Sequence, residues 1–350
     1  MLVKRKIVVF WMILGLFMVF FQIIIGGVTR LTGSGLSITK WEIITGTIPP
    51  LNAEEWEESF EFYKDTPQYR KLNEGMSMSE FKFIYFWEYL HRLWARLMGL
   101  VFIIPFIIFL VKRWLDKRII RRLVVLVILA AVVGLFGWIM VASGLIERPW
   151  VNAYKLSIHL CLALVVFSHL LWTVLLSLYG ANKKYTIMRR SMLTFLVLMG
   201  LQIFLGGMMS GMKASLLYST WPKMGTEWLP SILLDPGQWN VSNFVDYDTG
   251  PFLITIVQFF HRGIAYLLIL CSLYIVFQSN RKTNLRHFRS LNVVFITMLI
   301  IQMALGITTL IRTAGTVPVL YGVLHQAGAI FVLTISIVLF YFHSYKSTVY

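Results

Sequence analysis

The chain has 350 residues, of which 58% are hydrophobic and 14% charged, and its formal net charge is +16. Soluble domains are about 45–50% apolar and about 25% charged, so this composition excludes an ordinary soluble protein and indicates a membrane protein. The positive charge does not call for a nucleic-acid partner, because many of the basic residues lie in short loops between apolar segments.

Eight apolar segments are each long enough to cross a bilayer, which takes roughly 20 residues. They lie at about 7–28, 82–111, 123–143, 154–179, 191–212, 252–277, 291–311 and 319–343. The first follows a basic stretch but has no small-residue cleavage site after it, so we expect an anchor rather than a signal peptide. No Arg- and Ser-rich leader is present, which favours a bacterial cell inner membrane over an organelle. The sequence predicts an all-α polytopic membrane protein.

Basic residues mark the expected cytoplasmic side. The basic segments are 4–6, 112–122, 180–190, 278–290 and Lys346. Together they hold 18 of the 32 Lys and Arg residues but one of the 16 acidic residues. Short loops rich in Lys and Arg face the cytoplasm. We therefore expect both termini inside and the long loops 29–81 and 213–251 outside.

Motifs recur between the two halves of the chain, at offsets of 180, 170 and 166 residues. The recurring pairs are Gln22-x-x-x-Gly26-Gly27 with Gln202-x-x-x-Gly206-Gly207, His91-Arg92 with His261-Arg262, and His159 with His325. The seventh segment repeats Gln302-x-x-x-Gly306, whereas the third has no matching Gln. An even number of spans per half gives both halves the same orientation. We predict two repeated four-helix bundles, over residues 1–180 and 181–350.

Four of the seven histidines form a pattern inside the spans. His91, His159, His261 and His325 each lie in an even-numbered span, at a similar depth from its outer end. An ionisable group within a span is costly and suggests a function. Two imidazoles that face each other suit the axial positions of haem iron, whereas zinc would need a third or fourth ligand. We predict one haem site in each half, with a copper or iron site of His and carboxylate ligands as the alternative.

The remaining histidines and both cysteines carry no predicted chemistry. His169 has no counterpart in the other half and is expected to be a lone polar residue. We expect His287, in a basic loop, and His343, near the C-terminus, to be solvated or interfacial. Cys161 and Cys271 lie inside spans, so we expect small apolar side chains rather than a disulfide.

Glu88 breaks the symmetry between the halves. It precedes His91 by three residues and so lies on the same helix face, whereas Gln258 takes the matching place in the second half. Only the first half keeps a carboxylate there, which suggests that the first site reacts and the second holds a cofactor. An ion pair between Glu88 and Arg92 is the alternative. Arg262 has no such acid, so a haem propionate is its candidate partner.

These motifs are similar to those of the haem A synthase family, in the branch shared with mitochondria. The resemblance covers essentially the whole chain. It rests on GGVTRLTGSGLS at 26–37, W-E-x-x-x-G-x-x-P-P at 41–50, E-Y-L-H-R at 88–92 and H-R at 261–262. Another branch has cysteine pairs in its outer loops, which this chain lacks, so no thiol-dependent step is expected.

The resemblance implies an oxidoreductase that converts the C8 methyl of haem O to the formyl group of haem A by successive hydroxylation, for cytochrome oxidase biogenesis. It implies that His91 and His159 ligate the iron of the substrate haem and that His261 and His325 ligate haem b. Glu88 matches the essential carboxylate of the family and is the candidate catalytic residue. Haem O synthase and cytochrome oxidase assembly factors are candidate partners beside membrane lipid, and a homo-oligomer stays open.

Two other functions fit parts of the pattern. A b-type membrane cytochrome for electron transfer would ligate haem with the same histidines but has no need of Glu88. A parallel-repeat transporter would have Gly- or Pro-broken spans near mid-membrane, and the one mid-span proline is Pro105.

Overall fold

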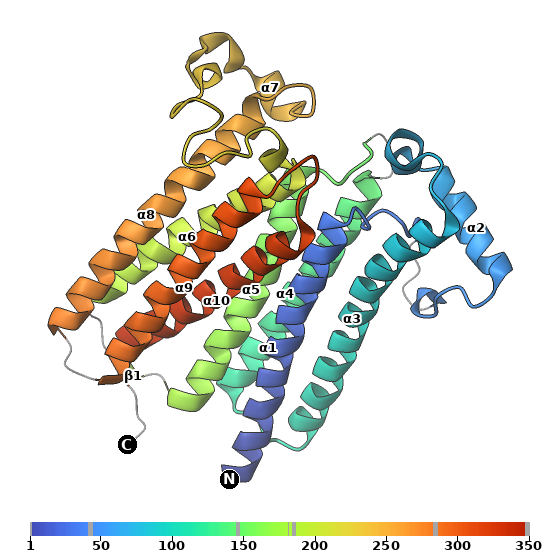
Figure 1. Ribbon diagram of the computed structural model, residues 1–350. Helices are drawn as coiled ribbons and strands as arrows, with labels where there is room; N and C mark the ends of the chain where they lie inside the picture. Colours follow the sequence, from blue (N-terminus) through green and yellow to red (C-terminus); the bar gives the residue numbers. More distant parts are fainter. Residues whose placement is uncertain are drawn as a thin grey trace. The chain divides into compact units, whose positions relative to one another are not determined.

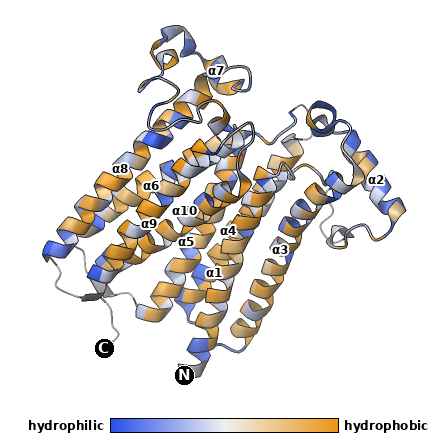
Figure 2. Cartoon of the chain, viewed as in Figure 1, coloured by the Kyte–Doolittle hydropathy of each residue, from blue (hydrophilic) through white to orange (hydrophobic). Residues whose placement is uncertain are grey.

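The computed structural model describes residues 2–40, 45–144, 148–180, 182–183, 187–282 and 286–346. Eight of its helices are long and apolar enough to cross a membrane. They are α1 (Leu2–Leu31), α3 (Met78–Val111), α4 (Lys117–Gly144), α5 (Ala153–Tyr179), α6 (Ile187–Gly211), α8 (Phe252–Lys282), α9 (Arg286–Ile311) and α10 (Val319–Ser344). Each predicted span falls on one of them, so the eight-span prediction is confirmed. Figure 2 shows hydrophobic residues along these helices and hydrophilic residues toward their ends.

Short elements occupy the two long loops. They are η1 (Thr45–Thr47), α2 (Ala53–Lys64) and η2 (Tyr69–Asn73) in the first loop, and η3 (Ala214–Leu216), η4 (Ser231–Leu234), η5 (Pro236–Gln238) and α7 (Val241–Val245) in the second. One two-stranded antiparallel sheet occurs in the described part of the chain, between β1 (Asn182–Lys183) and β2 (Tyr345–Lys346). The loop after α5 therefore lies beside the segment after α10.

The chain divides into two compact units, Met1–Leu170 and Leu171–Tyr350. In the first unit, α1 packs along α3 (Figure 1). In the second unit, α6 packs along α8, α9 packs along α10, and α10 also contacts α6. The boundary between the units falls inside α5, whereas the sequence places it in the loop that follows. The division into two repeated four-helix bundles stays a prediction.

The long loop of the first unit packs on the beginning of α3. The Ser77 side chain accepts a hydrogen bond from the Glu80 N–H, and the Glu80 carboxylate accepts one from the Ser77 N–H, which caps the helix. A buried apolar cluster then joins α2 to α3, and its members are Phe60, Tyr63, Phe81 and Ile84. Since Ile84 lies one turn before Glu88, this cluster fixes the part of α3 that carries the carboxylate.

The predictions for the two cysteines and for the three histidines outside the candidate site have different outcomes. Cys161 and Cys271 are free thiols within the helices, as expected. The His169 imidazole contacts the Arg122 carbonyl oxygen at 3.0 Å between Nε2 and O, which gives this lone polar residue a structural partner. The side chain of His287 lies outside the described residues.

The expectation that His343 is solvated or interfacial is wrong. Its side chain is buried and only 5% exposed. The reason is that the last turns of α10 pack against the end of α5. There the Tyr341 hydroxyl donates to the Gly180 carbonyl oxygen, and the Tyr341 ring contacts the Tyr179 ring.

Candidate active site

Each of the four histidines singled out in the sequence packs its imidazole against a glycine of a neighbouring spanning helix. The distance from an ideal Cβ placed on the glycine to the imidazole Cε1 is 3.0 Å for Gly26 and His91, 3.0 Å for Gly137 and His159, 3.2 Å for Gly206 and His261, and 2.8 Å for Gly306 and His325. Carbon atoms in contact prefer about 3.5–4.0 Å, so a side chain at any of these glycines would press on the ring. The glycines therefore admit the imidazoles between the helices.

Sequence analysis missed Gly137 as part of this pattern, because the third span lacks the glutamine that marks the other three. The spacing between Gly137 and Gly306 could have identified it. Gly306 follows Gly137 by 169 residues, close to the 166 residues that separate His159 from His325. The four glycine–histidine contacts thus extend the predicted repeat to the third span.

In three of the four cases, a glutamine one turn before the glycine contacts the same histidine. The Gln22 amide nitrogen lies 3.3 Å from both ring nitrogens of His91 and donates to its backbone oxygen at 3.1 Å. The Gln202 amide nitrogen lies 3.4 Å from Nε2 of His261. These contacts fix where each imidazole lies on its helix.

The contact between Gln302 and His325 also determines which ring nitrogen of His325 carries the proton. Gln302 donates from its side-chain amide to the backbone oxygen of His325 at 2.9 Å, and Nδ1 of His325 donates to the backbone oxygen of Gln302 at 3.1 Å. Because Nδ1 carries the proton in this bond, the lone pair of a neutral imidazole is on Nε2, where a metal ligand needs it.

The two histidines of the second unit face each other at the separation that a metal ion would require. The ring centroids of His261 and His325 are 6.5 Å apart, and the ring planes are 77° apart. Two opposed imidazoles with metal–nitrogen bonds of about 2 Å would have their centroids roughly 6 Å apart. Nδ1 of His261 is buried without a hydrogen-bond partner among the described residues. This pair fits the two axial ligands of a haem iron.

The two histidines of the first unit also lie near each other. His159 is close enough to His91 to interact with it electrostatically. Nδ1 of His159 is buried and has no hydrogen-bond partner in the described part of the chain. Within the described residues, no group of three His, Cys, Asp or Glu side chains gathers that could hold a metal ion, so the donors available are imidazole pairs rather than a zinc-type cluster.

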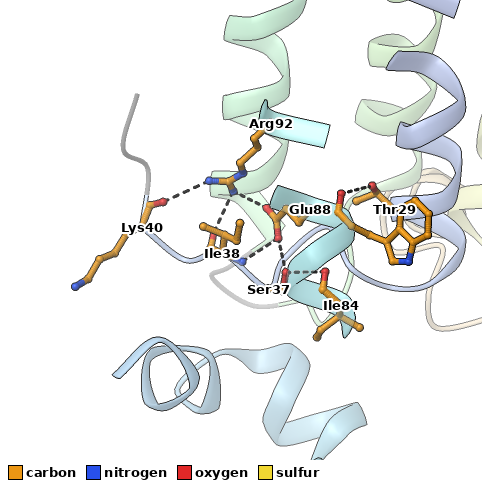
Figure 3. Close-up of polar contacts among 8 residues, drawn as sticks. Thr29, Ser37, Ile38, Lys40, Ile84, Glu88 and Arg92 are labelled. Atoms are coloured by element: carbon orange, nitrogen blue, oxygen red, sulfur yellow. Dashed lines mark hydrogen bonds and ion pairs between the residues drawn. The ribbon is translucent and has the colours of Figure 1, made fainter. Parts of the chain in front are cut away.

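Glu88 is buried, with 3% of its surface exposed, and both carboxylate oxygens are engaged (Figure 3). Arg92 donates to Oε1 at 2.5 Å, which forms the ion pair that the sequence left open as an alternative. The Ser37 hydroxyl and the Ile38 N–H each donate to Oε2 at 2.8 Å. Arg92 also donates to the carbonyl oxygens of Ile38 at 3.0 Å and Lys40 at 3.4 Å. Glu88 and Arg92 together hold the loop after α1 against α3.

The matching residues of the second unit hold the loop after α6 in a similar way, but without an acid. The Gln258 amide donates to the Tyr218 carbonyl at 2.7 Å. Arg262 donates to the carbonyl oxygens of Tyr218, Pro222 and Lys223 at 3.3, 3.4 and 3.1 Å. Nε of Arg262 is buried and has no hydrogen-bond partner within the described residues. The Nε–H of Arg262 is therefore available to donate a hydrogen bond to an anionic group of a ligand.

The motif residues between 26 and 50 contribute through both side chains and backbone groups. Thr29 donates to the Trp87 carbonyl at 3.1 Å, which ties the end of α1 to α3. Sequence analysis did not assign Ser37 or the Ile38 N–H to the Glu88 site, and their place at the end of the GGVTRLTGSGLS motif gave only a general signal. Trp41 and Glu42 of the W-E-x-x-x-G-x-x-P-P motif lie outside the described residues.

Replacing Gly306 by Ala is expected to displace the His325 imidazole, because the added methyl group would lie 2.8 Å from its Cε1 atom. The purified variant should lose or shift its low-spin haem spectrum. Gly263→Ala is the matched control, since an added Cβ there has no atom within 4 Å. Ala favours a helix interior over Gly by about 1 kcal/mol, so the control should keep both its haem and its stability. Equal haem spectra in the two variants would contradict the packing argument.

The chain is similar to known proteins over nearly its whole length. The COX15-CtaA family model, described as cytochrome oxidase assembly protein, matches residues 9–337. The heme A synthase of Flavobacterium psychrophilum is 40% identical over 336 residues, which cover 94% of this chain and 96% of the relative. The heme A synthase of Parvibaculum lavamentivorans is 38% identical over 332 residues, covering 94% and 92%. That of a Caulobacter species is 39% identical over 333 residues, covering 94% of each chain.

Proposed function

Because the chain belongs to the COX15-CtaA family of cytochrome oxidase assembly proteins, we propose that it oxidises the C8 methyl of haem O to the formyl group of haem A. The observation that carries this proposal is the asymmetry of two similar histidine pairs. Only the first pair has a buried carboxylate nearby, Glu88, and the second has Gln258 in the matching place. The haem A produced would serve cytochrome oxidase.

The second unit holds haem b as a cofactor through His261 and His325, with Arg262 on a propionate. The 6.5 Å between the two ring centroids supports this assignment. Haem b bound there supplies one-electron transfer. His325 is held in the tautomer that presents Nε2. The Nε–H of Arg262, which has no partner among the described residues, suits a carboxylate.

The first unit binds haem O as the substrate, with His91 and His159 as ligands of its iron. Conversion of a methyl to a formyl group is a four-electron oxidation, and it draws an oxygen donor and an electron acceptor from outside the chain. The two imidazoles orient the substrate, so that the same methyl group is presented at each successive hydroxylation.

Glu88 acts as a fixed negative charge at this site. The Ser37 hydroxyl, the Ile38 N–H and the Arg92 guanidinium surround its carboxylate. A carboxylate held in this way would stabilise positive charge that develops at the methyl carbon. Its contacts with the loop also close the outer end of the site.

The protein lies in a bacterial cell inner membrane with both termini in the cytoplasm. An even number of spanning helices, eight among the described residues, supports termini on the same side of the membrane. The pairing of Asn182–Lys183 with Tyr345–Lys346 brings a basic loop together with the C-terminal segment, in agreement with the distribution of charge.

Haem O synthase would deliver the substrate and assembly factors would receive the product, and the chain can act as a homo-oligomer.

Reporter fusions test this topology. Fusions at Glu74 and Asp246, in the two long loops, should report the outer side of the membrane. Fusions at Arg118 and Lys183 are the controls and should report the cytoplasm, because Lys and Arg in short loops are retained there. A cytoplasmic signal at either Glu74 or Asp246 would overturn the orientation and the placement of the sites near the outer surface.

Haem extraction from the purified protein separates the proposed activity from its rival. A synthase should retain haem b together with traces of haem O or haem A. A b-type electron-transfer cytochrome would yield haem b alone. Detection of haem b alone, after expression in cells that make haem O, would favour the cytochrome.

A further inference from the structure

The arginines that follow the first histidine of each pair differ in how their charge is compensated. Arg92 forms an ion pair with Glu88 at 2.5 Å and also donates to two loop carbonyl oxygens. Arg262 donates to three loop carbonyl oxygens but takes part in no ion pair among the described residues. Neutral carbonyl oxygens accept hydrogen bonds from a guanidinium but supply no counter-charge. The positive charge of Arg262 is therefore uncompensated within the described part of the chain.

Gln258 is the residue that makes this difference. It lies four residues before Arg262, as Glu88 does before Arg92, and side chains at this spacing are neighbours on a helix. Its amide donates to the Tyr218 carbonyl oxygen at 2.7 Å, and Arg262 donates to the same oxygen at 3.3 Å. Oε1 of Gln258 and Nε of Arg262 are both buried and have no hydrogen-bond partner within the described residues. A neutral amide thus occupies the place from which a carboxylate would neutralise the arginine.

The free Nε–H and the uncompensated charge of Arg262 together favour an anionic ligand group. A hydrogen bond from a guanidinium to a carboxylate is roughly twice as strong as one between neutral groups. Arg262 directly follows His261, and a haem held by that imidazole carries propionate carboxylates at its edge. A propionate is therefore the anion that a haem would bring to this arginine.

We propose that Gln258 is a positioning residue that keeps Arg262 available for a propionate of haem b, and thereby makes the second site retain its haem. This inference rests on the proposed function, in which the second pair holds a resident cofactor and the first binds a substrate. At the first site Glu88 already neutralises Arg92, so a substrate haem gains less from that arginine and is released more easily. The difference between Glu88 and Gln258 therefore also determines which haem stays.

The test follows the loss of haem b from the purified full-length protein to excess apomyoglobin, with the haem that remains on the protein identified by chromatography. Gln258→Glu should speed the loss of haem b by about tenfold, the effect of one hydrogen bond to a charged group. The reason is that the new carboxylate competes with the propionate for Arg262. Arg262→Gln removes the cationic partner itself and should speed the loss to a similar extent, so it tests the proposal if Gln258→Glu does not fold.

Gln258→Leu is the matched control. Like Gln258→Glu, it loses the hydrogen bond to Tyr218, but it adds no charge and should lose haem b at a rate close to that of the wild type. The dimethyl ester of haem b is the second control, because its esterified propionates carry no charge. It should leave the wild type and Gln258→Glu at the same rate.

Equal rates of haem b loss from the wild type and from folded Gln258→Glu would overturn the proposal, as would unchanged loss from Arg262→Gln. Equal acceleration by Gln258→Leu, or faster loss of the dimethyl ester from Gln258→Glu, would assign the effect to packing and overturn it as well. None of these rates depends on turnover, so the two inferences fail separately. Faster loss from Gln258→Glu in a chain that makes no haem A would leave the role of Gln258 standing and remove the proposed reaction. Haem A formation by the wild type, with no change of rate in the variant, would do the reverse.

Discussion

Glu88→Gln is expected to lower haem A formation about a hundred- to a thousandfold, while haem O or a partly oxidised intermediate accumulates. Removal of one preorganised electrostatic group typically costs about 3–4 kcal/mol of transition-state stabilisation. The amide keeps the size of the carboxylate but lacks its charge. The measurement is haem A formed per haem b retained, since haem b in the second unit counts the folded enzyme.

The ion pair adds an effect on stability to this prediction. With its amide oxygen toward Ser37 and Ile38, the new Gln side chain would turn its NH₂ group toward the donors of Arg92. Loss of one partner of a buried ion pair costs about 3–5 kcal/mol, and partial exposure of Arg92 reduces this figure. We therefore expect a lower yield of the single variant as well as lower activity.

The double variant Glu88→Gln/Arg92→Gln separates the two effects. It removes both charges, so yield and thermal stability should recover toward the wild type. Haem A formation should stay low, because the negative charge is still absent. Near-normal haem A in the single variant, or restored haem A in the double variant, would mean that Glu88 serves only to neutralise Arg92 and hold the loop.

His261→Ala and His325→Ala should each remove or strongly shift the low-spin haem b spectrum of the purified protein. Each change deletes one of two axial ligands, and a cofactor held by one imidazole would be lost or change its spin state. Haem A formation should fall with it. His169→Ala is the control, because His169 contacts the Arg122 backbone rather than another histidine, and its spectrum should stay normal. Unchanged haem content in both variants would remove the assignment of the cofactor site.

Hydropathy was sufficient to predict the eight spans, because each must contain about 20 apolar residues to match the thickness of the bilayer. The Gln-x-x-x-Gly motif was visible in three of the four spans, but the contact between each glycine and a histidine was not predicted. Gly137 was missed because Val133 replaces that glutamine.

The partners of Glu88 were not predictable from local sequence. An i, i+4 acid and base suggest an ion pair, and Arg92 does contact Glu88. Nothing in the sequence places Ser37 and Ile38 on the other oxygen, because that contact joins residues about 50 positions apart and depends on how the loop after α1 folds back. The burial of His343 was missed for the same reason, since it arises from packing between α10 and the end of α5.

The most direct test of the account is the haem made by cells that contain this chain. The chain is expressed with a haem O synthase in a bacterium that makes haem b but no haem A, and haems extracted from the membranes are separated by chromatography. We expect haem A in membranes that contain the chain and haem O alone, beside haem b, in membranes without it. Haem O without haem A, in membranes where the chain is present and carries haem b, would contradict the proposed reaction.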